Sequence, residues 1–338
     1  MSSSEGHRRA ESLRLRKYRA QKKVELNELE KELWYLQGKL AQLQAARRGH
    51  TPHTATPTEH KALHDAVEKQ TRLIRILSVW VASQTPEPSL VAPTAHATLL
   101  DDPSARLQGY YWLSNRVYHT ATTAFPSHPF GSRVDDSFQF QMHVADADGD
   151  GPIVTGMETH VQHTFFTSLD CVKTLLWSCE EHNRVQTYVV SSSESVDHVS
   201  HHLVYYGGVY QSTNTRVRRL VCLFEDTDRV VFTYVLVAHD ERFPMAEGEV
   251  RTHGFSWTIA ESVTDHITLV RHSTMHFAPV TRHGVASLQD IGRLYGQSAD
   301  GARYRQAYVE RIRSVAEIRN RDQYRALTSS LSHLLDQI

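Results

Sequence analysis

The sequence predicts an α+β fold, in which a long N-terminal coiled-coil helix precedes a curved antiparallel sheet packed on a long C-terminal helix. Residues 138–144 alternate apolar and polar side chains, which is the period of a half-buried strand, and similar segments follow. After residue 284 the apolar residues return to helical spacing, and over residues 26–43 leucines recur at coiled-coil spacing. A run of strands bounded by helices is typical of the α+β class.

The N-terminal helix carries a seam of leucines. Six of them recur at steps of three and four residues: Leu26, Leu29, Leu33, Leu36, Leu40 and Leu43. In a helix this spacing places them on one side, where they would pair with a second helix to form a dimer. The partner is another copy or a more basic zipper, since Glu25 would face and repel Glu30 of a parallel copy. The alternative is an intramolecular hairpin with the amphipathic segment 59–83.

The residues ahead of the leucines are strongly basic. Residues 1–50 contain twelve Lys and Arg against six acidic residues, net +6, whereas the whole chain carries a net charge of −1. The N-terminus is therefore the part of the chain where a polyanion such as DNA is expected to bind. The residues expected to contact it are Arg14, Arg16, Lys17, Arg19, Lys22 and Lys23. A solvated basic face without nucleic acid is the alternative interpretation.

Proline and glycine divide the rest of the chain, because both residues end helices. The predicted order is a basic helix over residues 1–48, a linker over 49–58, an amphipathic helix over 59–83, a second linker over 84–98, and a large domain over 99–338. We expect the large domain to contain the sheet and its C-terminal helix.

The large domain is expected to begin with a helix over 103–125 and a strand around 138–144. A helix over 167–181 should interrupt the strands. The further strand candidates are residues 153–166, 185–192, 201–211, 216–225, 229–238, 252–261 and 266–277. Most of them follow one another through short turns, which predicts an antiparallel meander.

Two stretches resemble known families. Residues 8–43 resemble a basic leucine zipper, with KYRAQKK at the place of that family's basic core. Residues 99–320 resemble a START-type, helix-grip lipid-binding domain, through the order of elements and through the segments GFSWTIAES and ITLVRHSTMHFAP. The combination is similar to a group of oomycete proteins. It implies contact with DNA and binding of a lipid or another apolar ligand between the sheet and the C-terminal helix.

The zipper resemblance has one departure. The family's invariant arginine corresponds to Arg19, but its base-reading asparagine corresponds to Glu11. A carboxylate cannot donate a hydrogen bond to a base edge, and phosphate repels it. The resemblance therefore implies contacts with the DNA backbone more than recognition of a base sequence.

One charged residue stands in an apolar row of the last predicted strand. Arg271 alternates in step with Leu269, Met275 and Phe277. We expect it to reach the polar group of a ligand inside the cavity. The alternative is that strand twist turns Arg271 to solvent.

The sequence predicts neither a metal site nor a cofactor. The three cysteines form no CxxC pair, and DADGDG over 146–151 has Met157 where a calcium loop needs a glutamate. His160 and His163 should point to opposite faces of a strand, which is poor geometry for chelation. No apolar run approaches the roughly 20 residues of a membrane span.

No catalytic motif is present, so no catalytic residue is predicted. The leading hypothesis is a non-enzymatic regulator that dimerises, contacts DNA and binds an apolar ligand, in the nucleus or cytoplasm. The alternative is a cytosolic lipid-binding or scaffold protein whose N-terminal coil only mediates assembly.

Overall fold

The computed structural model describes residues 57–83, 96–124, 128–146, 151–181 and 190–337. The chain divides into two compact units, Met1–Thr71 and Arg72–Ile338. Of the first unit, the described part is the beginning of helix α2 (Pro57–Ser83). The predicted basic helix and leucine seam therefore lie outside the described residues, and the predicted domain boundaries stay predictions.

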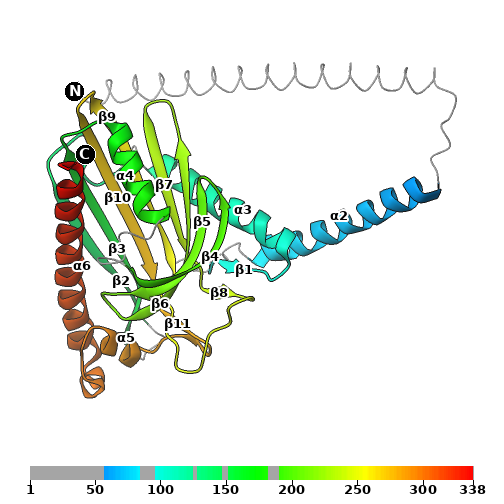
Figure 1. Cartoon of the computed structure of the whole chain (residues 1–338). Helices are drawn as coiled ribbons and strands as arrows, with labels where there is room; N and C mark the ends of the chain where they lie inside the picture. The colour runs from blue at the N-terminus through cyan, green and yellow to red at the C-terminus, as the bar shows by residue number, and fades with distance from the viewer. Residues whose placement is uncertain (1–56, 84–95, 125–127, 147–150, 182–189, 338) are drawn as a thin grey trace, which may run out of the picture. The chain divides into compact units, whose positions relative to one another are not determined.

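The second unit is built on an eight-stranded antiparallel sheet with the order β2-β3-β10-β9-β7-β6-β5-β4 (Figure 1). Its strands are β2 (Ser137–Asp146), β3 (Pro152–Phe165), β4 (Val190–Ser200), β5 (Leu203–Tyr210), β6 (Thr215–Glu225), β7 (Arg229–Leu236), β9 (Gly254–Thr264) and β10 (Ile267–Phe277). The expected strand at 185–192 overlaps β4 only at its start. Strand β4 continues to Ser200 because it pairs with β5 there.

Two short pairs of strands complete the sheet structure. Strand β1 (Thr98–Leu99) pairs in parallel with β8 (His239–Asp240), and β11 (Val280–Thr281) pairs with β12 (Gly284–Val285). The β1–β8 pair joins the segment before α3 to the segment that follows β7. No short local turn predicts such a parallel pair, because its two strands are far apart in the sequence.

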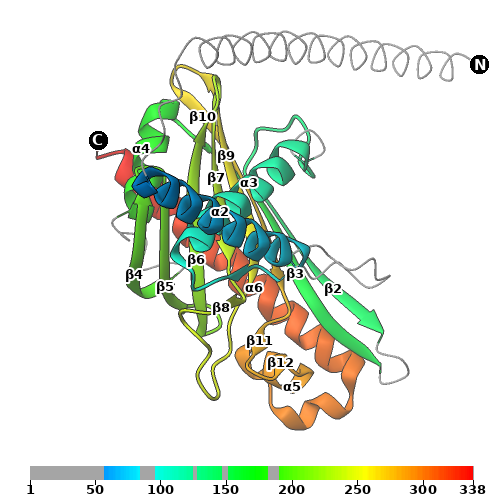
Figure 2. The same cartoon turned by 90° about the vertical axis from the view of Figure 1, so that its right-hand side faces the viewer.

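Helices cover both faces of the sheet. Helix α3 (Pro103–Ala124) packs on one face through Leu113 and Val117, and α4 (Leu169–Glu181) and α6 (Arg305–Leu335) pack on the other. Figure 2 shows the sheet between α3 and α6. The short α5 (Leu288–Leu294) and the 3₁₀ helix η3 (Ala299–Arg303) lead into α6. None of the described helices is both long and apolar enough to cross a bilayer.

Strand β7 shows why the sheet is buried on both sides. Val231 and Val235 belong to the core with α3, whereas Phe232 and Tyr234 belong to the core with α4 and α6. Successive residues of a strand point to opposite faces, so an almost wholly apolar strand fits between two helical layers. The predicted α+β fold, with an antiparallel sheet packed on a C-terminal helix, is thereby confirmed.

Candidate ligand-binding site

A cavity of about 120 Å³ lies between the sheet and the helices α4 and α6. Alternate residues of β10 line it, because they point to the same face of the strand. Its apolar walls include Val161, Phe165, Leu176, Leu236, Val270, Leu327 and Leu331. Its polar groups include Glu180, Arg219, Thr258, His272, Thr274, His276 and Tyr324. A mainly apolar enclosure with a few polar groups has the usual composition of a small-molecule site.

A mostly buried ion pair forms one part of this wall. Both terminal nitrogens of Arg219, on β6, lie 3.1 Å from the carboxylate oxygens of Glu180, at the end of α4. Tyr206 donates to Glu180 Oε2 at 2.9 Å and accepts a hydrogen bond from Arg219. Arg219 also lies over the ring of Tyr234, 4.4 Å from its centroid. The guanidinium is therefore held by charge, hydrogen bonds and an aromatic face.

Burial and charge together shift the pKa values of Arg219 and its neighbour Tyr206. Burial opposes the charge of Arg219, but Glu180 and the nearby tyrosine oxygens outweigh it, so the pKa of Arg219 lies above its ordinary value. Burial also raises the pKa of Tyr206 well above the ordinary value. The Tyr206 hydroxyl therefore stays protonated at neutral pH and can donate to Glu180.

Two histidines of β10 line the cavity in neutral form. Burial, followed by the charge of Arg219, lowers the pKa of His272 to about 3 and that of His276 to about 4. The ring nitrogens of His272 lie 2.8 Å from Thr258 Oγ1 and 2.7 Å from Thr274 Oγ1. The ring of His276 meets the ring of Tyr210 edge-on at 5.3 Å. A neutral imidazole offers one hydrogen-bond donor and one acceptor, which suits a hydroxyl or carbonyl group.

The structure places Arg271, the residue expected to reach a ligand, away from this cavity. Its neighbours Val270 and His272 line the cavity, so Arg271 points to the opposite face of β10. There it donates to Gln162 Oε1 at 2.8 Å and to the Gly131 carbonyl at 2.8 Å. It does not turn to solvent either, since only 7% of its surface is exposed. Arg271 fixes the loop before β2 instead of meeting a ligand.

Arg219 was not among the predicted site residues, although the sequence carries the same kind of signal for it as for Arg271. Arg219 stands in an alternating row of β6 with Val217, Val221 and Leu223, all of which are buried in the core with α4 and α6. A charged residue in that row was as informative as Arg271 in its own row. Its partner Glu180 could not be found in this way, because it belongs to a different element.

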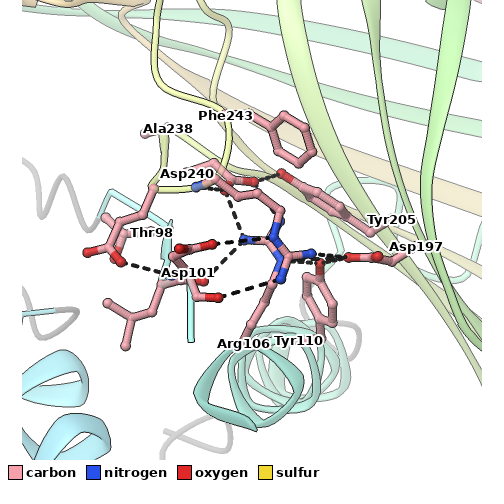
Figure 3. Close-up of polar contacts among 12 residues, drawn as sticks. Thr98, Asp101, Arg106, Tyr110, Asp197, Tyr205, Ala238, Asp240 and Phe243 are labelled. Carbon is pink, nitrogen blue, oxygen red and sulfur yellow. Dashed lines mark hydrogen bonds and ion pairs between the residues drawn. The ribbon is translucent and has the colours of Figure 1, made fainter. Parts of the chain in front are cut away.

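A second buried arginine lies on the other face of the sheet (Figure 3). Arg106, on α3, donates to both carboxylate oxygens of Asp240 at 2.8 Å. Its Nε donates to the Tyr110 hydroxyl at 2.6 Å, and Tyr110 donates to Asp197 at 2.6 Å. Tyr205 donates to Asp240 as well. Arg106 is 2% exposed, and these contacts tie α3 to β4, β5 and β8.

The histidines considered as metal ligands serve other roles. His160 Nδ1 lies 2.9 Å from Ser273 Oγ, on the face of β3 away from the cavity, whereas His163 lines the cavity and pairs with Asp136. Within the described parts of the chain, no group of three or more His, Cys, Asp or Glu could hold a metal ion. The basic residues and leucines singled out at the N-terminus lie outside those parts.

Similar folds occur among solved structures. Human STARD10 is 9% identical with a TM-score of 0.35, over 70% of this chain and 87% of that chain. Human StAR-related lipid transfer protein 5 is 12% identical with a TM-score of 0.37, over 62% and 96%. The Zhui aromatase/cyclase from Streptomyces is 12% identical with a TM-score of 0.33, over 53% and 94%. At such TM-scores the helix-grip description follows from this chain's own sheet and helix.

Neither a protein-family model nor a curated protein sequence matches the chain.

Proposed function

We propose that the second unit binds an apolar ligand carrying a hydrogen-bonding group. The observation that carries this proposal is the cavity between the sheet and α6, in which the Glu180–Arg219 pair faces apolar walls. The apolar part of a ligand would displace water from Leu327 and Leu331, and its polar group would bond to Glu180 or His276.

The size of the cavity limits the ligand. About 120 Å³ is below the roughly 300 Å³ at which pockets for drug-sized ligands begin. It is close to an engineered cavity of about 150 Å³ that binds benzene in another protein. A ligand with a single ring therefore fits the cavity as it stands, and a longer lipid requires α6 to move outward.

Helix α6 is built in a way that favours such a movement. Its fully buried residues are Tyr308, Val309, Ile312, Ala316 and Leu331. The stretch between Ala316 and Leu331, which lies over the cavity through Tyr324 and Leu327, has no fully buried residue. Few buried contacts lower the free energy needed to displace a segment.

Ligand retention tests the proposal. Native mass spectrometry of the full chain, purified and then incubated with a cell lipid extract, should show bound small molecules. Leu327→Phe should remove them by filling the cavity, whereas Ile318→Phe, on the same helix at a position 57% exposed, should not. Identical bound mass in wild type and Leu327→Phe would overturn the proposal.

We propose ligand binding and not catalysis because the Glu180 carboxylate is already bonded to neighbouring side chains. Among the described residues that line the cavity, Glu180 is the sole carboxylate, and Arg219 and Tyr206 occupy it. Acid–base chemistry needs a proton-transfer group with a pKa near the working pH. Two of the lining histidines, His272 and His276, have pKa values of about 3 and 4 and do not provide one, and the third, His163, is engaged by Asp136.

We further propose that the basic N-terminal helix contacts DNA phosphates, which would make the protein a ligand-binding regulator. The basic excess of residues 1–50 supports this proposal. A mobility-shift titration of the full chain should show duplex binding that weakens steeply with salt. Changing Arg16, Lys17 and Arg19 to Ala should reduce the salt slope by about one unit per lost contact. Absence of binding at low salt would favour the cytosolic lipid-binding or scaffold alternative.

A further inference from the structure

Helix α2 has the sequence of a second coiled-coil seam, separate from the leucines at 26–43. Its seam residues recur at steps of four and three: Leu63, Val67, Gln70, Ile74, Leu77 and Val81. All three a positions are β-branched (Val67, Ile74, Val81), and two of the three d positions are leucine. β-Branched residues at a with leucine at d favour parallel two-stranded coils over larger assemblies.

The first part of this seam is exposed along the helix. Leu63 is 64% exposed, Val67 55% and Ile74 62%. The seam becomes covered only further along, where Leu77 and Val81 pack in part against the core with α3. An apolar stripe on a helix normally faces a partner, and these values show that the described chain leaves it exposed from Leu63 to Ile74.

The charges of α2 lie away from the seam. Between the first and last seam residues, every Lys, Arg, Asp and Glu occupies a b, c or f position: Asp65, Glu68, Lys69, Arg72 and Arg75. In a parallel pair of copies, Ala66 would face Thr71 and Leu73 would face Ser78, so no like charges meet. The upstream seam differs, because there Glu25 would face Glu30. The α2 seam is thus electrostatically compatible with its own copy.

Gln70 distinguishes between two occupants of the seam. In a parallel pair of copies, Gln70 meets Gln70 of the second copy in the same layer, and the two amides can bond to each other. In a hairpin with the leucines at 26–43, the amide of Gln70 would be buried against leucine and left unsatisfied.

We therefore infer that α2 pairs in parallel with α2 of a second copy of this chain through the exposed part of the seam, from Leu63 to Ile74, while Leu77 and Val81 stay packed against the core with α3. The pairing places two ligand-binding units in one assembly, whether or not either cavity is filled. It also brings the two upstream leucine seams together, which raises their effective concentration for one another.

Cysteine cross-linking of the full chain tests the inference, with Cys171→Ser in the background to remove a partly exposed thiol. Under mild oxidation, Leu63→Cys and Ile74→Cys should each join two copies covalently. The b-position control Arg75→Cys should cross-link at least tenfold less. Cross-linking of both seam positions requires a parallel, in-register pair, because an antiparallel pair brings equal positions together only at its centre.

Mass in solution provides a second measurement that does not depend on disulfides. Wild type should sediment as a dimer, and Gln70→Leu should lose this single stoichiometry and form larger species as well. A monomer whose mass is unchanged by Gln70→Leu would indicate the hairpin and overturn the inference. So would a dimer in which positions 74 and 75 cross-link equally, since the upstream leucines alone would then hold it.

Discussion

Two arginines on opposite faces of one sheet, Arg106 fully buried and Arg219 mostly buried, make the same kinds of contact but differ in their surroundings. Arg106 and Arg219 each pair with a carboxylate, Asp240 or Glu180, and each contacts tyrosine hydroxyls. Adjacent residues of β5 even supply one tyrosine to each network: Tyr205 belongs to the first and Tyr206 to the second. The difference between the two lies in what surrounds them.

At the centre of the Arg106 network, the Arg106–Asp240 pair is enclosed by protein groups. The side chain of Asp240 is 0% exposed, and it receives hydrogen bonds from Arg106, Tyr205 and the backbone of Arg242. The Arg219 pair instead borders a cavity, and the side chains of Arg219 and Glu180 are 15% and 12% exposed. Polar groups whose hydrogen bonds are all made within the protein stabilise the fold. Polar groups that border a cavity can also bind a ligand.

Asp240→Ala should have the largest effect on stability. It leaves the charge of Arg106 buried without its carboxylate, which costs about 3–5 kcal/mol. Urea denaturation measures this loss. Asp101→Ala, which removes a carboxylate 70% exposed, should change stability by less than about 1 kcal/mol. Equal effects of the two changes would contradict the structural role given to the Arg106 network.

The two tyrosines of β5 offer a matched comparison. Tyr205→Phe should destabilise by about 1.5–3 kcal/mol, because it removes a hydrogen bond to a charged group in a fully buried site. Tyr206→Phe should cost about 1 kcal/mol or less, because water in the cavity can replace the lost hydroxyl. Chemical denaturation of both variants measures the two losses of stability. A larger loss for Tyr206→Phe than for Tyr205→Phe would show that no water in the cavity replaces the hydroxyl.

Acid should act on the two neutral histidines of the cavity before it breaks the Arg106–Asp240 pair. His272 and His276, with pKa values of about 3 and 4, stay neutral in the folded state, but they take up protons near pH 6.5 when unfolded. The free energy of unfolding should therefore fall as the pH drops from about 6.5 to 4, by at most about 1.4 kcal/mol per pH unit for each histidine.

The Arg106–Asp240 pair should itself hold over that range. Although burial disfavours the charge of Asp240, the hydrogen bond from Arg106 lowers its pKa below the ordinary 3.8, so that pair is lost only at lower pH. Denaturation of His276→Gln between pH 4 and 7 should show a shallower dependence than wild type. His283→Gln, at a position 75% exposed, is the control. An unchanged slope in His276→Gln would refute the assignment.

Replacing the whole cavity pair should have the smallest effect on stability. Arg219→Met together with Glu180→Leu removes both charges and leaves neither unpaired, so the change should lie within about 1 kcal/mol. Retention of a ligand with a polar group should nevertheless fall, as native mass spectrometry would show. A large loss of stability would mean that the pair holds α4 on the sheet.

The order of helices and strands could be predicted because its signals are local. Alternation over β2 and helical spacing over α3 and α6 depend on neighbours within a few residues. The β1–β8 pair could not be predicted, because residues 98 and 239 are brought together only by the folded chain. The partner of each buried arginine has the same origin, since Arg106 and Asp240 are 134 residues apart.

The sequence by itself determined that Arg271 and Arg219 each stand in an apolar row of a strand. Alternate residues of a strand point to the same face, so the members of each row follow from the sequence. Only the tertiary structure decided which row meets a cavity. Both faces of this sheet are covered by helices, so apolar character does not distinguish one face from the other. The packing of α4 and α6 leaves space beside Arg219, whereas Arg271 lies on the opposite face, bonded to Gln162 and the Gly131 carbonyl.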